Sequence, residues 1–289
     1  MTAPKISFEF FPPQTIEASF RLWDTVQTLA PLDPRFVSVT YGAGGTTRDL
    51  TREAVAALHK SSGLRVAAHL TCVNATRDET LGIARDFAAA GVRDIVALRG
   101  DPPKGTGAFV PHADGFANSV DLISALRTAG DFTIRVGAYP DTHPEAASAA
   151  ADIDWLKAKL DAGADEALTQ FFFEAETFFR FRDACDKAGI DAARITPGIL
   201  PIENWKGASR FARNCGTVIP QWLEDAFETA LRDGREDLLA TAVCAELCSD
   251  LIDGGVERLH FYTLNRPELT RDVCHALGVT PRVSLKNVA

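Results

Sequence analysis

The sequence predicts an α/β protein folded as a single (β/α)8 TIM barrel, and three observations favour this fold. Short runs rich in apolar, β-branched and aromatic residues alternate with longer segments of helical periodicity along the whole chain of 289 residues. Eight such runs occur, and the first six spacings between them are about 30 residues, the size of one strand-and-helix unit. The first run ends in Pro12 and Pro13 rather than in the GxGxxG turn of a doubly wound sheet, and prolines offer no backbone N–H to a phosphate.

Each expected strand is a short apolar run that ends at polar or turn-forming residues. The strands are expected at 5–11, 35–41, 65–72, 94–99, 133–139, 166–173, 194–200 and 258–264. Helices are expected between them, where apolar residues recur at three- and four-residue intervals. They lie at 51–61, 76–90, 118–128, 147–161 and 175–188, and in one long stretch at 222–253. No low-complexity linker or shift in composition divides the chain, so we expect one domain over residues 1–289.

Composition excludes several classes of function. The net charge is −9, with 39 acidic and 30 basic residues, and no cluster of Lys and Arg suits binding to nucleic acid. No apolar run approaches the roughly 18 to 20 residues that span a bilayer, and the N-terminus lacks a signal-like apolar segment, so we expect a cytoplasmic protein with no membrane partner. The six cysteines have no CxxC or zinc-site spacing, so we expect reduced thiols and no metal.

Polar side chains follow most of the expected strands at their carboxyl ends. They are Glu9, Thr40, His69, Arg99, Asp101, Tyr139, His143, Gln170, Tyr262 and Arg266. In a (β/α)8 barrel these ends meet on one face, where the chemistry of such enzymes is placed. Buried polar groups cost free energy unless they are paired, so this set is improbable as plain core and predicts one pocket.

Two carboxyl groups in this set have more than one interpretation. Glu9 lies among aromatic residues, where desolvation is expected to raise its pKa toward that of a general acid. A structural carboxylate paired with Arg or Lys fits the same pattern equally well. Asp101 stands in a Gly-Asp-Pro sequence, which is also ordinary turn chemistry. The residues alone leave both questions open.

Eight sequence blocks resemble the bacterial methylenetetrahydrofolate reductase family. They are SFEFFPP (7–13), FVSVTYGAGG (36–45), AHLTC (68–72), LRGDPP (98–103), AYPDTHPEA (138–146), LTQFFF (168–173), TPGILP (196–201) and HFYTLNR (260–266). The resemblance covers nearly the whole chain. It implies a barrel that carries FAD, is reduced by NAD(P)H, and then reduces 5,10-methylenetetrahydrofolate to 5-methyltetrahydrofolate, a methyl donor for methionine synthesis.

The resemblance also implies roles for individual residues. Glu9 would be the general acid that opens the folate ring, and Asp101 would lie beside the flavin and tune its reactivity through its negative charge. The implied FAD contacts are Thr40, His69, Leu98, Arg99, Gly100, Asp101, Phe116, Ala117, Tyr139, His143, Asp152 and Lys159. The implied contacts to folate and nicotinamide are Glu9, Asp101, Gln170, Phe211, Tyr262 and Arg266.

The chain departs from the family pattern at two places. Gly207 stands where relatives can have a glutamine that reaches the substrate. Trp155 and Ala158 stand where a relative has polar or basic residues beside the adenosine half of FAD, so that end of the site is expected to be built differently.

Alternative hypotheses remain beside the flavoenzyme. A barrel without flavin could move hydride directly from nicotinamide to folate, a methyltransferase barrel could bind folate, and a noncatalytic protein could only bind it. Nothing in the residues chooses between NADH and NADPH. Relatives form homo-oligomers, so we expect a homo-oligomer here, with 244–253 as a candidate assembly helix, and no C-terminal regulatory domain.

Overall fold

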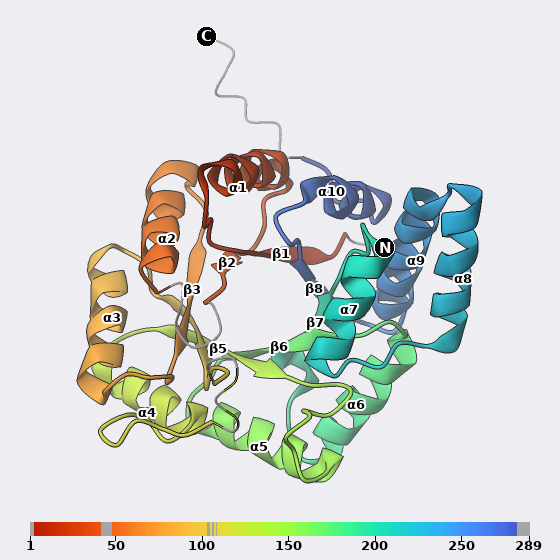
Figure 1. Ribbon diagram of the computed structural model, residues 1–289. Helices are drawn as coiled ribbons and strands as arrows, with labels where there is room; N and C mark the ends of the chain where they lie inside the picture. Colours follow the sequence, from red (N-terminus) through yellow and green to blue (C-terminus); the bar gives the residue numbers. More distant parts are fainter. Residues whose placement is uncertain (1–2, 42–47, 103–104, 106, 108, 282–289) are drawn as a thin grey trace.

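The computed structural model describes residues 3–41, 48–102, 105, 107 and 109–281, and it confirms the predicted barrel (Figure 1). Within these residues eight parallel strands close in chain order, and β8 pairs with β1 in a register that sets Phe8 beside Phe261. The strands are β1 Lys5–Phe10, β2 Val37–Val39, β3 Val66–Thr71, β4 Asp94–Leu98, β5 Thr133–Ala138, β6 Glu166–Phe171, β7 Ile195–Ile199 and β8 Arg258–Tyr262. Each strand is shorter than the apolar run that predicted it. A strand ends where its backbone hydrogen bonds to the neighbouring strands end, and the apolar run continues beyond that point.

Helices surround the strands, and each predicted helical segment contains helix. Within the described ranges the α-helices are α1 Ile16–Leu29, α2 Arg48–Ser62, α3 Arg77–Ala89, α4 Ser119–Ala129, α5 Ala149–Asp161, α6 Ala175–Lys187, α7 Trp205–Cys215, α8 Gln221–Asp233, α9 Glu236–Asp253 and α10 Pro267–Ala276. The long stretch at 222–253 is two helices, because Gly234 adopts a left-handed φ of 65° that ends α8. None of these helices is long and apolar enough to cross a membrane.

Side-chain caps set where several helices begin. The Thr76 hydroxyl accepts the Glu79 N–H and the Glu79 carboxylate accepts the Thr76 N–H, a capping box that places Thr76 just outside α3. At α4 and α5 the cap is a single hydrogen bond, in which the Asn118 side chain accepts the Asp121 N–H and the Ser148 hydroxyl accepts the Ala151 N–H. The predicted helices begin one or two residues early at these points, because a capping residue lies outside the helix that it caps.

A buried ionic network closes the N-terminal end of the barrel. The Arg135 guanidinium, 2% exposed, contacts Asp94 at 2.6 Å and Glu166 at 2.9 Å, and lies over the Phe36 ring. Asp94 and Glu166 are the first residues of β4 and β6, so the network belongs to the end opposite the predicted pocket. These charges can be buried because each one is paired with a charge of opposite sign. The cavities lie at the other end of the barrel, where the strands have their carboxyl ends.

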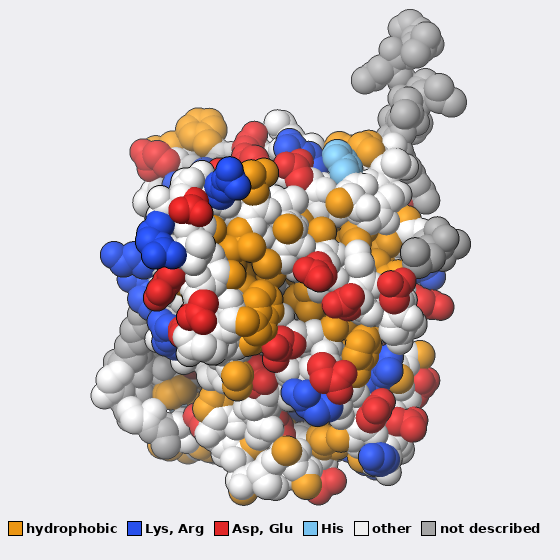
Figure 2. All heavy atoms as spheres, turned by 90° about the vertical axis from the view of Figure 1, so that its right-hand side faces the viewer, with side chains coloured by type: hydrophobic (Ala, Val, Ile, Leu, Met, Phe, Trp, Pro, Cys, Tyr) orange, Lys and Arg blue, Asp and Glu red, His pale blue; other side chains and the backbone are white. Residues whose placement is uncertain are grey.

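One outer face of the barrel carries a groove with an apolar floor and an acidic rim. Figure 2 shows apolar side chains flanked by acidic ones on the side formed by α8 and α9. A groove of about 740 Å³ on this side is lined by Phe179, Trp222 and Leu247, with Glu246 and Asp250 among its acidic residues. Trp222 is 47% exposed, which is unusual for so large an apolar side chain.

Candidate active site

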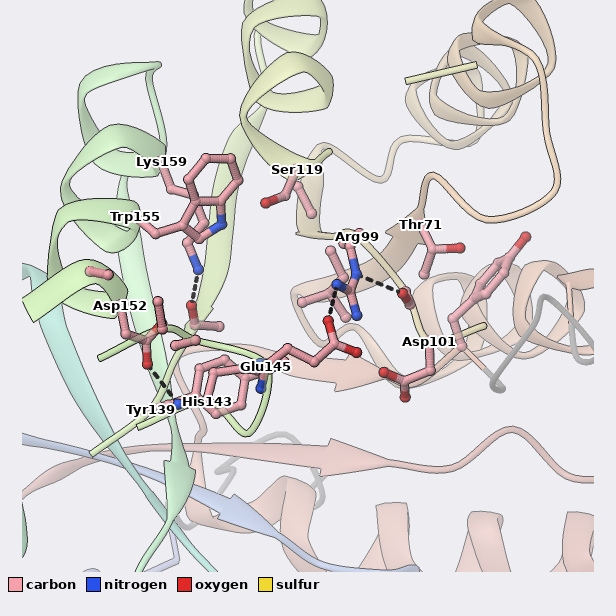
Figure 3. Close-up of a pocket in the computed structure, with 18 residues that line it drawn as sticks. Thr71, Arg99, Asp101, Ser119, Tyr139, His143, Glu145, Asp152, Trp155 and Lys159 are labelled. Carbon is pink, nitrogen blue, oxygen red and sulfur yellow. Dashed lines mark hydrogen bonds and ion pairs between the residues drawn. The ribbon is translucent and has the colours of Figure 1, made fainter. Parts of the chain in front are cut away.

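Two adjoining cavities lie at the carboxyl ends of the strands. The larger, about 420 Å³, lies between the ends of β4 and β5 and the helix α5 (Figure 3). The smaller, about 180 Å³, lies beside Glu9 of β1. Leu98, Gly137 and Tyr139 line both cavities, so the two spaces meet at the ends of β4 and β5. Of the ten polar residues predicted to share one pocket, all but Thr40 and Arg266 line one or other of these two cavities.

The larger cavity contains a buried lysine that has spare hydrogen-bond donors. Lys159 is 7% exposed and its Nζ donates to the Gly137 carbonyl at 2.6 Å. Burial lowers the pKa of Lys159 to about 8, and the Asp152 carboxylate opposes this shift. An ammonium has three N–H donors, so within the described residues two remain for a ligand. A desolvated cation with free donors is suited to an anionic group such as a phosphate.

Asp152 and His143 fix the loop that follows β5. The Asp152 Oδ2 accepts the His143 backbone N–H at 2.8 Å, which ties this loop to α5 (Figure 3). The Tyr139 ring meets the His143 ring edge to face, with centroids 4.6 Å apart. Burial, and then the negative charges of Asp101 and Asp152, raise the pKa of Tyr139 to about 12, so Tyr139 is a neutral hydrogen-bonding group.

Arg99 is held at the rim of the larger cavity by an acidic partner that sequence reasoning missed. Its guanidinium forms an ion pair with Glu145, and it also lies 5.0 Å from the centre of the Phe109 ring. The hydrogen bond from Arg99 lowers the pKa of Glu145, so the pair stays ionised at neutral pH. Asp101 lines the same cavity with its side chain exposed. Because Glu145 offsets the charge of Arg99, Lys159 is the cavity cation without a close acidic partner among the described residues.

The smaller cavity is built around the carboxyl group of Glu9. One carboxylate oxygen, Oε2, lies 3.1 Å from His69 Nε2 and 3.6 Å from His260 Nε2, and it accepts the Ser38 hydroxyl at 3.2 Å. These three partners come from β3, β8 and β2, so they meet only when the barrel closes. The 3.1 Å contact is short enough for an ion pair, although the angle is not that of a good hydrogen bond.

The expectation that the pKa of Glu9 is raised is wrong for the protein without ligands. Burial does oppose ionisation, but the two nearby imidazoles, His69 before His260, outweigh it and lower the pKa of Glu9 to about 2. The alternative interpretation expected a pairing with Arg or Lys, and the partners are instead two imidazoles. Both interpretations missed that His260 lies beside this carboxyl group.

Aromatic side chains form the walls of the smaller cavity. Phe171 stacks on Phe211, with centroids 5.4 Å apart and an interplanar angle of 25°, and it meets Tyr262 edge to face. The Tyr262 hydroxyl donates to the Thr169 carbonyl at 2.6 Å, and burial raises the pKa of Tyr262 well above its usual value. The Gln170 side-chain carbonyl accepts the Phe171 N–H at 3.1 Å, which leaves its NH2 group for a ligand within the described residues. Such walls suit a flat heteroaromatic ring.

Four predicted site residues line neither cavity. Thr40 follows β2 and is held by its backbone, whose N–H donates to the Phe10 carbonyl. Phe116 is fully buried under the guanidinium of Arg77, and Ala117 is exposed. Arg266 is largely exposed and lies 3.8 Å from Glu203. The ligand contacts predicted for these four residues stay predictions.

Several cavity residues were not among the predicted site residues. Thr71, Ser119, Glu145 and Trp155 line the larger cavity (Figure 3). His260 lies beside Glu9, which lines the smaller cavity. Thr71, Glu145 and His260 fall inside the sequence blocks that resemble the family, and this membership was the one signal by which they could have been predicted. Gly207 is three positions into α7, where its N–H donates to the Asn204 side chain. It precedes Phe211 by one helical turn, so it lies on the side of α7 that reaches the smaller cavity.

These features define a class of protein: a (β/α)8-barrel enzyme whose site combines a cleft holding a buried lysine with a buried acid in an aromatic pocket. The family model for methylenetetrahydrofolate reductase matches residues 2–278. The chain is 47% identical to the 5,10-methylenetetrahydrofolate reductases of Salmonella typhimurium and Escherichia coli, and each alignment covers 96% of this chain and 91% of the relative. The chain therefore belongs to the methylenetetrahydrofolate reductase family, and it is an oxidoreductase.

Two further relatives are more distant. The chain is 37% identical to methylenetetrahydrofolate reductase (NADH) 1 of Arabidopsis thaliana, over 94% of this chain and 48% of that protein. A solved structure from Clostridium thermocellum, described as binding two copies of 5-methyl-5,6,7,8-tetrahydrofolic acid, superposes with a TM-score of 0.62 at 16% identity. It covers 96% of this chain and 95% of its own, and at this identity it supports the fold alone.

Proposed function

We propose that this protein reduces 5,10-methylenetetrahydrofolate to 5-methyltetrahydrofolate, with NAD(P)H as electron donor and FAD as the carrier between the two. The 47% identical relatives are 5,10-methylenetetrahydrofolate reductases, which supports the reaction. The observation that carries the proposal is the position of Glu9, a carboxyl group enclosed by imidazoles and aromatic rings in a pocket that adjoins the cleft of Lys159. We also propose that residues 1–289 act as one catalytic domain.

The larger cavity fits the parts of FAD. Lys159 has free donors for the pyrophosphate, and the 41% exposed Trp155 lines the cavity on the same helix, one turn away, with a flat face for the adenine. Arg99, Gly100, Tyr139 and His143 would lie along the flavin and its ribityl chain, near the junction with the smaller cavity. When bound, FAD takes hydride from NAD(P)H and gives it to the folate.

The smaller cavity would hold folate and nicotinamide in turn, because both are flat rings that must reach the same flavin. Phe211 and Tyr262 would enclose either ring, and Gln170 has an amide NH2 for the acceptors of the pterin. With room for one ring at a time, the reaction would proceed by a ping-pong sequence. Gly207 provides no side chain for a further substrate contact.

Glu9 would supply the proton that the folate needs. Protonation of the folate N10 breaks its bond to the one-carbon unit and leaves an iminium cation that accepts hydride at carbon. When substrate binds, it excludes water from around Glu9, which favours the neutral acid and opposes the effect of the imidazoles. The exposed carboxylate of Asp101, which lines the larger cavity, would stabilise the positive iminium.

An anaerobic absorbance experiment tests this proposal. The purified protein should be yellow, lose its flavin absorbance when NADH or NADPH is added, and recover it when methylenetetrahydrofolate follows. A colourless protein that cannot be loaded with FAD yet reduces folate would support direct hydride transfer instead. Flavin that is reduced but ignores folate would refute the proposed acceptor.

The predicted homo-oligomer is also a proposal, with the groove on the α8 and α9 face as its candidate contact. The exposed side chains of Trp222, Leu231 and Leu238 lie on this side of the molecule and would be covered by a second copy. Sedimentation of the purified protein would test it, and a monomer at micromolar concentration would refute it.

A further inference from the structure

The environment of His260 points to a function that no predicted role covers. This side chain is 0% exposed, and it lies between Ser7 of β1 and Glu9 two residues further along the same strand. Its Nδ1 is 2.8 Å from the Ser7 hydroxyl oxygen, and its Nε2 is 3.6 Å from Glu9 Oε2. The imidazole therefore connects a buried hydroxyl group to the proposed acid.

The contacts of Ser7 indicate which ring nitrogen carries the proton. The Ser7 hydroxyl also lies 3.3 Å from the Leu259 carbonyl, which can only accept a hydrogen bond. A hydroxyl has one proton, so both contacts of Ser7 are hydrogen bonds only if Ser7 donates to Leu259 and His260 Nδ1 donates to Ser7. In a neutral imidazole with its proton on Nδ1, Nε2 carries a lone pair.

That arrangement requires a proton between His260 and Glu9. The lone pair of a neutral Nε2 would face an ionised carboxylate oxygen, with no side-chain donor of the described residues bonded to that nitrogen, which is unfavourable in a buried site. The contact becomes attractive when one proton is added, either on Nε2, to give an imidazolium beside a carboxylate, or on Glu9, to give an acid beside a neutral imidazole. Both forms contain one transferable proton.

We propose that Ser7, His260 and Glu9 form a proton store, in which His260 is the positioning residue that keeps a proton available to Glu9. This inference rests on the proposed function, since reduction of methylenetetrahydrofolate consumes one proton in each turnover. The proton passes from His260 Nε2 to the Glu9 carboxylate and from Glu9 to the folate N10. The bond from N10 to the one-carbon unit would break as N10 gains this proton, the carbon would accept the hydride that bound FAD supplies, and solvent would later restore the proton to His260.

The other groups around this unit are compatible with a stored proton. Within the described residues, Glu9 is also faced by the His69 imidazole at 3.1 Å, by the Ser38 hydroxyl, and by the neutral Tyr262. The His260 ring stacks on Phe36, with centroids 5.6 Å apart. Two guanidinium groups lie over the same Phe36 ring, Arg135 at 3.7 Å and Arg35 at 5.6 Å from its centre. Their charges are matched by Asp94 and Glu166.

Nitrogen-15 NMR of the histidine-labelled full-length protein tests the inference without any turnover. We expect His260 Nδ1 to be protonated between pH 6 and 8, and its Nε2 resonance to shift in the Glu9→Gln variant. The His260→Gln variant assigns the signal, and His275→Gln, at an exposed site on α10, is the matched control. A neutral His260 with its proton on Nε2 would overturn the inference, because Glu9 would then be a simple hydrogen-bond acceptor.

Rapid-mixing kinetics test the same inference in the FAD-loaded enzyme. The His260→Gln variant should slow flavin reoxidation by methylenetetrahydrofolate about tenfold at pH 8 and move the alkaline limb of that step to lower pH. Flavin reduction by NADH, which takes no proton from Glu9, should stay within about twofold of wild type. An unchanged pH profile for the folate step would refute the inference.

Two further results keep the outcome interpretable. If His260→Gln does not fold, Ser7→Ala leaves the imidazole in place and should move its proton from Nδ1 to Nε2, with slower folate reduction. If the wild-type flavin is not reoxidised by folate at all, the proposed function fails. The NMR result still decides whether His260 and Glu9 share a proton.

Discussion

Replacing Lys159 with methionine should stabilise the protein without FAD and weaken its binding of FAD. Burial lowers the pKa of Lys159 from 10.5 to about 8, so the folded state binds this proton less tightly than the unfolded state. At about 1.4 kcal/mol for each pKa unit, the charged lysine costs about 3 kcal/mol of stability at pH 7. Its hydrogen bond to the Gly137 carbonyl, worth about 1 to 2 kcal/mol, offsets part of that cost. We expect Lys159→Met to gain roughly 1 to 2 kcal/mol.

The sign of the pH dependence is a second part of this prediction. Because the folded pKa is depressed, the wild type should gain stability from this group as the pH rises from 8 to 10.5, and Lys159→Met should lack that gain. Urea unfolding of the FAD-free protein at pH 7 and at pH 9.5 measures both effects. FAD affinity, followed by quenching of flavin fluorescence, should fall about tenfold to a hundredfold for the loss of a charge-assisted contact to pyrophosphate.

Lys157 is the matched control for this experiment. It lies on the same helix, 41% exposed, in a surface ion pair with Asp161 at 3.4 Å. Such pairs contribute about 0 to 1 kcal/mol, so Lys157→Met should change neither the unfolding free energy nor FAD affinity substantially. The reasoning would be refuted if Lys159→Met were no more stable than Lys157→Met, or if the two variants bound FAD equally well.

Three other perturbations have defined outcomes. Glu9→Gln should slow flavin reoxidation by folate at least about a hundredfold and leave reduction by NADH intact in stopped-flow traces, whereas full folate activity would exclude Glu9 as the acid. Although burial opposes it, hydrogen bonds from Arg35 and Thr196 lower the pKa of Glu166 to about 2, so its stabilisation is complete above pH 4.5 and is lost as the pH falls toward 2. Glu166→Gln should therefore cost about 3 kcal/mol in urea unfolding at pH 7 and flatten the acid dependence, and an unchanged acid dependence would contradict this. Trp222→Glu should reduce the mass measured by sedimentation while the flavin stays bound, and an unchanged mass would remove the groove on α9 as the contact between copies.

The repeating pattern of the sequence determined the architecture. Eight apolar runs at near-regular spacing predicted eight strands, because a buried parallel strand must be apolar on both faces and needs a helix to return the chain. The sequence also predicted the starts of α3 and α4, at Thr76 and Asn118, to within one residue. A capping side chain bonds a backbone N–H only a few positions further along the chain, so the signal is local. The division at Gly234 was missed, because helical periodicity continues on both sides of it.

The sequence also determined which residues would meet at one end of the barrel. Glu9, Gln170 and Tyr262 stand at strand ends, and a closed parallel sheet places all such ends on one face whatever the details of packing. Phe211 lies on a helix, and its place in the smaller cavity came only from resemblance to the family. The separation of the site into two cavities that meet at Leu98 and Tyr139 had no local signal, because it depends on how the loops and α5 pack.

Only the tertiary structure decided the chemistry of Glu9. The sequence showed the Glu9 carboxyl group among aromatic residues. Desolvation by such neighbours, taken alone, would raise the pKa of Glu9. Closure of the barrel brings His69 and His260 to the same carboxylate oxygen, from strands far away along the chain, and their effect exceeds that of burial. The pKa of a buried group depends on the few charges within several ångströms, and which charges those are is set by the fold.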